Sequence, residues 1–412
     1  MKSYIKDNSR YKVTFNVRQI LFAFVVCFFL FSEHGHFELS VFLDNLHVKH
    51  FLVMIIAFLY GIPLLRKKNV RGAAEVRYVL FCAGILYVIT LAFQAFHLTF
   101  KLFSVGEVYY FIMPVLLITI MFNSTNKDEA DFIMTCALFT SLVLYFYGAF
   151  KSGNVTAGNI LKMLNLKNLF INSISPIYES SISNYFLLMF AYFRYRGKEN
   201  RAILSAIGCL FGYKRFAVLF LIIFIVVLRV VPRYKSVSNK VLIPVIIFFC
   251  LLPLTVYFVI TDSFSNWFFS KFGLDFNEFS MSRFQIYRAI VYANIPNYGL
   301  GTTTAYLRAN IKTIAAANLH NDLFRFYYET TILGTITFTY SYFKMSQKSW
   351  FTFLTMVYIF FELFGAFYFG QGSMSFWLLA YILIFTISID CDNHKKQLEE
   401  AANKALINEK QK

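Results

Sequence analysis

Cysteine is scarce in this chain, and its placement excludes two kinds of site. Six cysteines are spread over 412 residues, and five of them lie inside apolar runs. None forms a Cys-x-x-Cys pair or stands beside a histidine at the spacing of metal ligands. The sequence therefore predicts neither a disulfide framework nor a zinc site.

Apolar residues, by contrast, are abundant. The chain is 58% hydrophobic and contains 52 phenylalanines, more than a single soluble core can bury. Apolar runs of span length recur from end to end, with no internal repeat or low-complexity segment between them. The first run, 17–31, lacks a small-residue cleavage site and is interpreted as a retained helix. The sequence predicts an all-α, polytopic membrane protein that forms one integral membrane domain over 1–412.

Length, flanking charge and turn residues predict about twelve membrane-spanning helices. One region has two interpretations, because Gly212, Lys214 and Arg215 interrupt a long apolar stretch at 202–231. It forms either two short helices or one kinked element. The predicted spans are 16–32, 50–65, 77–96, 108–123, 131–150, 182–195, 202–213, 215–231, 241–260, 321–343, 349–368 and 374–390.

The net charge is +17, and the loops explain most of it. Basic residues fall on one side of the predicted spans, in the N-terminus, 66–71, 194–201, 229–235, 344–348 and the charged helical tail 391–412. The positive-inside rule makes that side cytoplasmic. Both termini are therefore expected in the cytoplasm, and no nucleic-acid partner is predicted.

The opposite side receives three longer loops, at 33–49, 151–181 and 261–320. The last loop, between the ninth and tenth predicted helices, is long for a simple connection and carries aromatic and helix signals. Ser280 and Ser282 can cap a helix in it that runs to about Asn294. The first loop carries four histidines, His34, His36, His47 and His50.

Cationic side chains gather on this outer side, against the charge bias of the topology. Arg283 and Arg288 lie about 140° apart around a helix, so we expect one to bind a ligand and the other to brace the loop. Arg215, taken alone, also fits a helix-end arginine that reaches the lipid headgroups. The outer cations are Arg215, Arg283, Arg288, Arg308 and Lys312.

A glycine turn and a polar helix start follow these cations. The turn PNYGLG occupies 296–301, and His320 and Asn321 stand at the mouth of the next span. The histidine is either a base or a structural cap. Glu329 lies about 180° from His320 on a straight helix, which disfavours a direct pair between them.

Inside that span, Asp322, Arg325 and Glu329 fall on one helical stripe. Charged groups at membrane depth are costly unless they are paired. Arg325 can pair with either acid, so we interpret Arg325 and Glu329 as structural, within a triad that neutralises itself. Asp322 is an alternative base to His320.

The order of these motifs resembles the O-antigen ligase/polymerase superfamily. Three positions depart from the pattern of that superfamily: Thr331 stands where glycine is common, Lys214 where a small residue is usual, and Tyr287 in place of a frequent tryptophan. The resemblance is carried by Arg215; Arg283 with Tyr287; Pro296, Gly299 and Gly301; His320 and Asn321; Glu329; and Gly334.

The resemblance implies a GT-C-like fold and a metal-independent glycosyltransferase without a cofactor. Its substrates would be undecaprenyl-diphosphate-linked oligosaccharides, handled at the periplasmic face of the bacterial inner membrane. Arg215 and Arg283 are the expected catalytic diphosphate ligands, and His320 is the expected base. Substrate contacts are expected from Arg288, Asn321, Asp322, Tyr287, Gly299, Gly301 and Arg308.

Among the members of the superfamily, the high phenylalanine content favours an O-antigen polymerase, which transfers glycan onto another lipid-linked repeat unit. An O-antigen ligase, which transfers the polymer to lipid A-core, is the alternative. Membrane lipids and a chain-length regulator are the other expected partners. A lipid-linked oligosaccharide flippase is the alternative from a different class, although flippases tend to show internal repeats. A purely structural or receptor protein fits the arginine-histidine series least.

Overall fold

The computed structural model of the protein describes residues 16–35, 48–67, 69–124, 127–163, 165, 175–178, 180–280, 283–310, 319–366 and 373–410. These residues form helices joined by turns, and no strand occurs among them. The prediction of an all-α protein is confirmed for this part of the chain.

A helix lies at each of the twelve places where the sequence predicts a span. These are α1 (Val17–His34), α3 to α4 (Val48–Leu65), α5 (Ala73–Phe96), α6 (Phe103–Ser124), α7 (Lys127–Lys151), α10 (Ser183–Tyr195), α11 (Glu199–Gly212), α12 (Arg215–Val230), α13 to α14 (Asn239–Val259), α19 (Asp322–Met345), α20 (Trp350–Gly365) and α21 (Met374–Lys410).

Seven helical segments in the described chain are long and apolar enough to cross a membrane. The protein is therefore a polytopic membrane protein, while the crossings of the other predicted spans and the GT-C-like fold stay predictions. The seven segments begin at Val17, Val48, Ala73, Phe103, Glu129, Asn239 and Met374.

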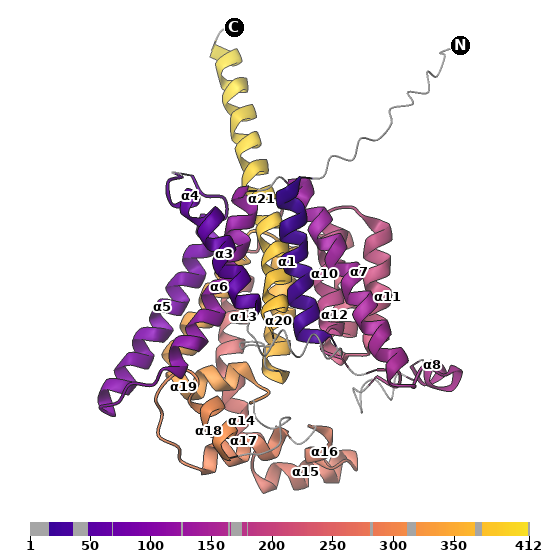
Figure 1. The fold of residues 1–412 in the computed structure, drawn as a ribbon, viewed down its shortest axis with the longest axis vertical. Coiled ribbons are helices and arrows are strands. Elements are labelled where there is room, and N and C mark those ends of the chain that lie inside the picture. The colour runs from indigo at the N-terminus through magenta and orange to yellow at the C-terminus, as the bar shows by residue number, and fades with distance from the viewer. Residues whose placement is uncertain are drawn as a thin grey trace.

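The bundle has two distinct ends (Figure 1). The terminal end carries α4 (Ile62–Leu65) and the protruding tail of α21. The loop end carries α8 (Ala157–Met163) and the helices α15 to α18. Between the two ends, α21 runs through the middle of the bundle and is buried along nearly all of its apolar part.

The ambiguous region 202–231 forms two helices rather than one kinked element. α11 ends at Gly212 and α12 begins at Arg215, and the turn between them holds Tyr213 in the left-handed region at φ 56°. A Cβ atom at Gly212 would lie 2.2 Å from Cβ of Ser183 in α10, so only glycine permits this close approach of α10 and α11. The turn therefore places Lys214 and Arg215 beside the start of α10.

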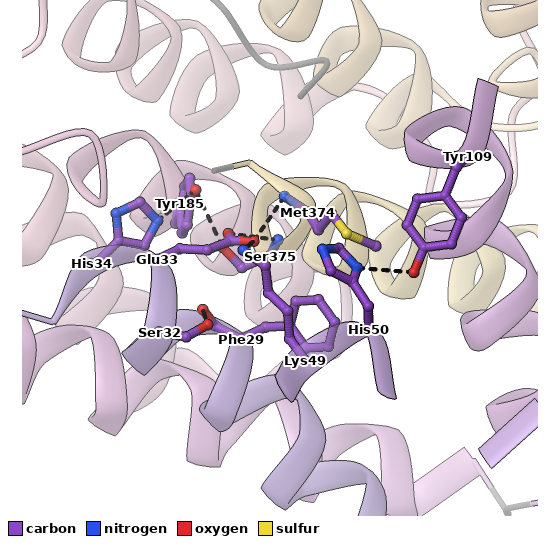
Figure 2. A network of polar contacts seen from close by, with 10 residues as sticks. All are labelled: Phe29, Ser32, Glu33, His34, Lys49, His50, Tyr109, Tyr185, Met374 and Ser375. Carbon is purple, nitrogen blue, oxygen red and sulfur yellow. Dashed lines mark hydrogen bonds and ion pairs between the residues drawn. The ribbon is translucent and has the colours of Figure 1, made fainter. Parts of the chain in front are cut away.

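A buried ion pair joins three helices near the loop end (Figure 2). Glu33 of α1 accepts the backbone N–H groups of Met374 (3.1 Å) and Ser375 (3.0 Å), which would otherwise be unpaired donors in the first turn of α21. Lys49 of α3 lies 3.4 Å from the same carboxylate, and both side chains are fully buried. The pair thus fixes α1 and α3 to the start of α21.

The predicted histidine loop at 33–49 is partly helical, which corrects the sequence-based boundary. α1 extends through His34, and α3 begins at Val48 and includes His50. The imidazole of His34 lies 2.7 Å from the hydroxyl of Tyr185, and that of His50 lies 2.9 Å from the hydroxyl of Tyr109 (Figure 2). His36 and His47 lie outside the described residues.

The described part of the long loop contains four short helices, α15 (Asp262–Phe272), α16 (Phe276–Phe279), α17 (Arg283–Tyr292) and α18 (Thr302–Asn310). The hydroxyl of Ser280 accepts the N–H of Phe284 at 3.3 Å, as the sequence predicts, whereas Ser282 lies outside the described residues. The helix ends earlier than predicted, at Tyr292, because Asn294 adopts a positive φ of 46° that cannot continue a helix.

Candidate functional site

Two helix starts bring three cationic side chains together at the loop end. Lys214 occupies the turn before α12, Arg215 begins α12, and Arg283 begins α17. We call these residues the cation cluster. Arg283 is close enough to repel both Arg215 and Lys214 electrostatically. All three are only partly exposed, so solvent screens their repulsion incompletely. Arg215 and Arg283, which the sequence predicts as partners, do lie near each other.

Glu362, in the last turn of α20, is an acid close enough to act on Lys214. It is 7% exposed, accepts a hydrogen bond from the side-chain amide of Asn184 at 2.9 Å, and attracts Lys214. Glu362 attracts Lys214, but the described groups around Lys214 also include the cations Arg215 and Arg283, so positive charge is in local excess. Such an excess in a partly buried place favours an anionic ligand.

The turn residue Lys214 responds most strongly to this environment. Burial lowers the pKa of its ammonium group from the ordinary 10.5 to about 8; Glu362 acts in the opposite direction, and Arg283 and Arg215 lower it further. An anion bound between the cations would reverse this shift, because it stabilises the charged form. The cluster therefore has the electrostatics that favour binding of an anion.

Aromatic and small residues complete the surroundings of the two arginines. The guanidinium of Arg215 lies 4.9 Å from the ring centre of Phe279 in α16, within cation–π range. A Cβ atom at Gly365, the last residue of α20, would lie 3.6 Å from Nη1 of Arg283. Arg215 thus packs against α16, and the guanidinium of Arg283 lies beside the end of α20.

Tyr287 connects the cation cluster to the start of α19. It lies one turn after Arg283 on the same face of α17, and its hydroxyl donates to the backbone carbonyl of His320 at 3.0 Å. Burial raises the pKa of this hydroxyl to about 12, with Arg283 acting in the opposite direction, so it stays protonated as a donor. His320 is partly exposed beside this contact.

Asn321 caps α19. Its side-chain oxygen accepts the N–H of Phe324 at 2.9 Å. Its amide nitrogen is buried near the Tyr287 hydroxyl and makes no hydrogen bond of ordinary geometry with any atom of the described residues. Asn321 therefore caps α19 through its side-chain oxygen, while its amide nitrogen points a hydrogen-bond donor toward Tyr287.

Arg288 lies apart from Arg283, as the 140° separation predicts. Its guanidinium is 2.6 Å from the carboxylate of Asp262 at the start of α15 and lies over the rings of Phe284 and Tyr292. The hydrogen bond with Asp262 raises the pKa of Arg288. Arg288 thus braces α15 against α17, while Arg308 is exposed in the last turn of α18. Lys312 lies outside the described residues.

The glycines of the PNYGLG turn have packing roles. Gly299 and Gly301 adopt φ values of 86° and 87°, which favour glycine. A Cβ at Gly299 would lie 2.6 Å from Cα of Thr90 in α5, and one at Gly301 would lie 2.7 Å from the ring of Phe103 in α6. The sequence predicts substrate contacts from both glycines, but the structure encloses them in protein contacts.

A separate group of charges, the buried ion network, lies along α19. Arg325 contacts Asp322 at 3.1 Å and Glu107 of α6 at 3.0 Å, and the guanidinium is fully buried. Glu329 instead accepts the N–H groups of Gly301 (2.9 Å) and Thr303 (2.8 Å) at the start of α18. Arg325 is also electrostatically attracted to Glu329, so the predicted triad is joined by Glu107, and Glu329 in addition holds the glycine turn.

α19 is interrupted just after Glu329. Thr331 has φ 62° and ψ −174°, a combination that is almost exclusive to glycine. Position 331 is also where the sequence resemblance expects glycine. The kink turns the helix beyond the network without disturbing the hydrogen bonds of Glu329.

Sequence reasoning missed two acids, one that attracts Lys214 and one that pairs with Arg325. Glu362 and Glu107 each interrupt an apolar run, and an acid at membrane depth signals a nearby partner. That signal does not say which cation is the partner, since Glu107 and Arg325 are 218 residues apart in the chain. The sequence marks Lys214 as a break in the apolar stretch 202–231 and as a departure from the family pattern, but it does not indicate a role for it in a site.

Comparison with known proteins identifies no relative from which a role could be transferred. No family model matches the chain, and neither the curated proteins nor the solved structures compared with it include a match.

Proposed function

We propose that this protein is an O-antigen polymerase, a glycosyltransferase that moves an undecaprenyl-diphosphate-linked glycan onto another lipid-linked repeat unit. The observation that carries the proposal is the cation cluster: three partly buried cations at the starts of α12 and α17, where Glu362 attracts Lys214. A diphosphate carries the charge that this arrangement lacks.

The location of the cluster suits a lipid-linked anion. It lies at the loop end of a membrane-embedded bundle, where a diphosphate attached to a lipid would be held at headgroup depth. Guanidinium groups bind phosphate oxygens through two parallel hydrogen bonds and stay charged at all relevant pH values. Arg215 and Arg283 therefore suit the leaving group of a glycosyl transfer.

The proposed reaction is a substitution at the anomeric carbon of the donor sugar. The acceptor hydroxyl oxygen attacks this carbon, and the bond from carbon to the diphosphate oxygen breaks with its electron pair. The hydroxyl proton passes to the imidazole of His320. The cation cluster stabilises the negative charge that develops on the departing diphosphate. Undecaprenyl diphosphate and an extended glycan are the products.

The chain also offers a way to position this base. Tyr287 joins the backbone of His320 to the helix that carries Arg283, and Asn321 fixes the start of α19. The base and the leaving-group site are thus set by the same two helices. This geometry suits a glycosyltransferase whose acceptor is a lipid-linked repeat unit and one whose acceptor is lipid A-core. A genetic experiment is therefore needed to distinguish a polymerase from a ligase.

Arg283→Ala and His320→Ala test the proposal in cells. We expect normal protein levels with surface glycans reduced to single-repeat length. Arg229→Ala serves as the matched control, because Arg229 lies exposed at the opposite end of α12 from Arg215. Unchanged chain-length ladders in both site variants would contradict the assignment of these residues.

Deletion of the gene separates the polymerase from the ligase. Lipopolysaccharide that carries one repeat unit on its core indicates a lost polymerase. Bare core together with accumulated lipid-linked polymer indicates a ligase.

A further inference from the structure

We infer that α15 is an interfacial helix whose aromatic face rests on the lipid surface at the loop end of the bundle. This inference goes beyond the proposed function and does not depend on it. The partner is the phospholipid leaflet itself, bound by the rings of α15 at the level of the headgroups.

The sequence of α15 divides its circumference unequally. At about 100° per residue, five aromatic rings occupy an arc of about 200°, which also includes Ser265 and Lys271. The polar residues Asp262, Ser263, Asn266 and Ser270 are confined to about 100° on the other side. The rings belong to Phe264, Trp267, Phe268, Phe269 and Phe272.

Among the described residues, the ring contacts from α16 reach only the middle of the aromatic arc. Phe264 and Phe268 pack on Phe276 of α16, with ring centres 4.9 and 5.0 Å apart. The flanks are open: Trp267 is 49% exposed, Phe269 60% and Phe272 59%. A short helix with large rings exposed on both sides of its packed face is expected to lie on an apolar surface.

The open rings continue a surface that faces lipid. The segment Asn239–Val259 is one of the seven apolar crossings, and its exposed side chains recur every three or four residues along one stripe. The stripe ends at Phe258, which is 64% exposed, and the ring of Phe258 lies 5.1 Å from that of Phe264 in α15. The residues of this stripe are Ile243, Ile247, Leu251, Leu254 and Phe258.

The residue types in α15 also fit the membrane interface. Tryptophan is enriched where acyl chains meet headgroups, and lysine places its stem on the apolar side and its ammonium in water. Trp267 and Lys271 lie one turn apart and provide both features. A partner protein or a second copy of the chain would leave unexplained why the rings continue a lipid-facing stripe.

The position of α15 is fixed relative to the cation cluster. Asp262 pairs with Arg288 of α17, and the ring of Phe268 lies 5.3 Å from that of Phe279. Phe279 in turn lies under the guanidinium of Arg215. A continuous set of rings therefore connects the proposed lipid contact with the cluster, and α15 would hold the site at headgroup depth.

The fluorescence of Trp267 tests this contact without any activity measurement. Wild type and Trp267→Phe are placed in vesicles of phosphatidylethanolamine and phosphatidylglycerol, and the difference between their emission spectra isolates Trp267. Bromine is introduced either near the headgroup end of the acyl chain or near its terminus. We expect loss of most of the difference signal with the shallow bromine, a smaller loss with the deep bromine, and little quenching by aqueous iodide.

Three results would overturn the inference. Quenching by iodide with none by brominated lipid places Trp267 in water. Quenching by neither places it under protein, and stronger quenching by the deep bromine places it in the acyl core. Because no glycan transfer is measured, failure of this inference and failure of the proposed function are distinguishable.

Discussion

Lys214 makes the cation cluster sensitive to pH, and this sensitivity can be measured as diphosphate binding. Burial lowers the pKa of Lys214 to about 8, so its ammonium is charged below this pH and largely neutral above it. The charged form attracts an anion, whereas the neutral amine does not. We therefore expect the affinity for an isoprenyl diphosphate to fall as the pH rises through 8.

The size of the change follows from the charged fraction of Lys214. With a pKa of about 8, this fraction is about 0.9 at pH 7 and about 0.1 at pH 9. If the diphosphate binds only the charged form, its Kd rises about tenfold between these values, or about 1.4 kcal/mol. The ligand does not contribute, because a phosphate group with a second pKa near 6 is ionised throughout this range.

The assay is calorimetric titration of a short-chain isoprenyl diphosphate into the purified protein at pH 7 and pH 9. Lys214→Arg stays charged at both values and is expected to give one Kd. Lys235→Gln is the matched control: it lies in the connection after α12, at the terminal end, and should keep the tenfold change. An equal Kd at both pH values in the wild type, or a tenfold change retained by Lys214→Arg, would refute the reasoning.

Three further changes probe the framework around the site. Arg325→Met leaves Glu107 and Asp322 buried without their cation and is expected to lower the free energy of unfolding by about 3–5 kcal/mol, measured by reversible unfolding in detergent. Thr331→Gly removes a strained backbone conformation and should raise that free energy by about 1 kcal/mol after the entropic cost of glycine. Gly212→Ala forces α11 away from α10 and should cost about 1–3 kcal/mol, measured as a lower midpoint of thermal denaturation.

Each of these changes has a comparison that can contradict it. A loss below about 1 kcal/mol for Arg325→Met would mean that the acids are neutral or hydrated. Thr337 lies in regular helix, so Thr337→Gly should lower the free energy of unfolding. If Thr331→Gly lowers it as well, relief of strain at position 331 is excluded. Gly158→Ala, at a position with open space in α8, should leave the midpoint unchanged, in contrast to Gly212→Ala.

The sequence predicts the helices well because their signals are local. Apolar length and flanking charge place a helix at each of the twelve predicted spans, and a helix is observed at each. The 33–49 boundary is wrong because the hydrogen-bond partners of His34 and His50 come from α10 and α6. Polar residues that form hydrogen bonds with each other inside a helix bundle resemble loop residues when each is judged from the sequence alone.

The candidate site is predictable in part. The sequence selects Arg215 and Arg283, and the structure brings them together; it also selects Gly299 and Gly301, whose close neighbours in α5 and α6 are not visible from the turn itself. Glu362 and its bond to Asn184, 178 residues earlier, depend on the packing of α10 against α20. No local pattern encodes such a pairing.

Transfer by the purified protein tests the proposed function most directly. The protein is reconstituted in vesicles with a labelled undecaprenyl-diphosphate-linked repeat unit, and the products are separated by length. We predict a ladder of lipid-linked glycans longer than one repeat, lost in Arg283→Gln and retained in Arg229→Gln. A wild-type reaction that leaves only single repeats, or an equal ladder in Arg283→Gln, would contradict the proposal that the cation cluster holds the diphosphate of a polymerase substrate.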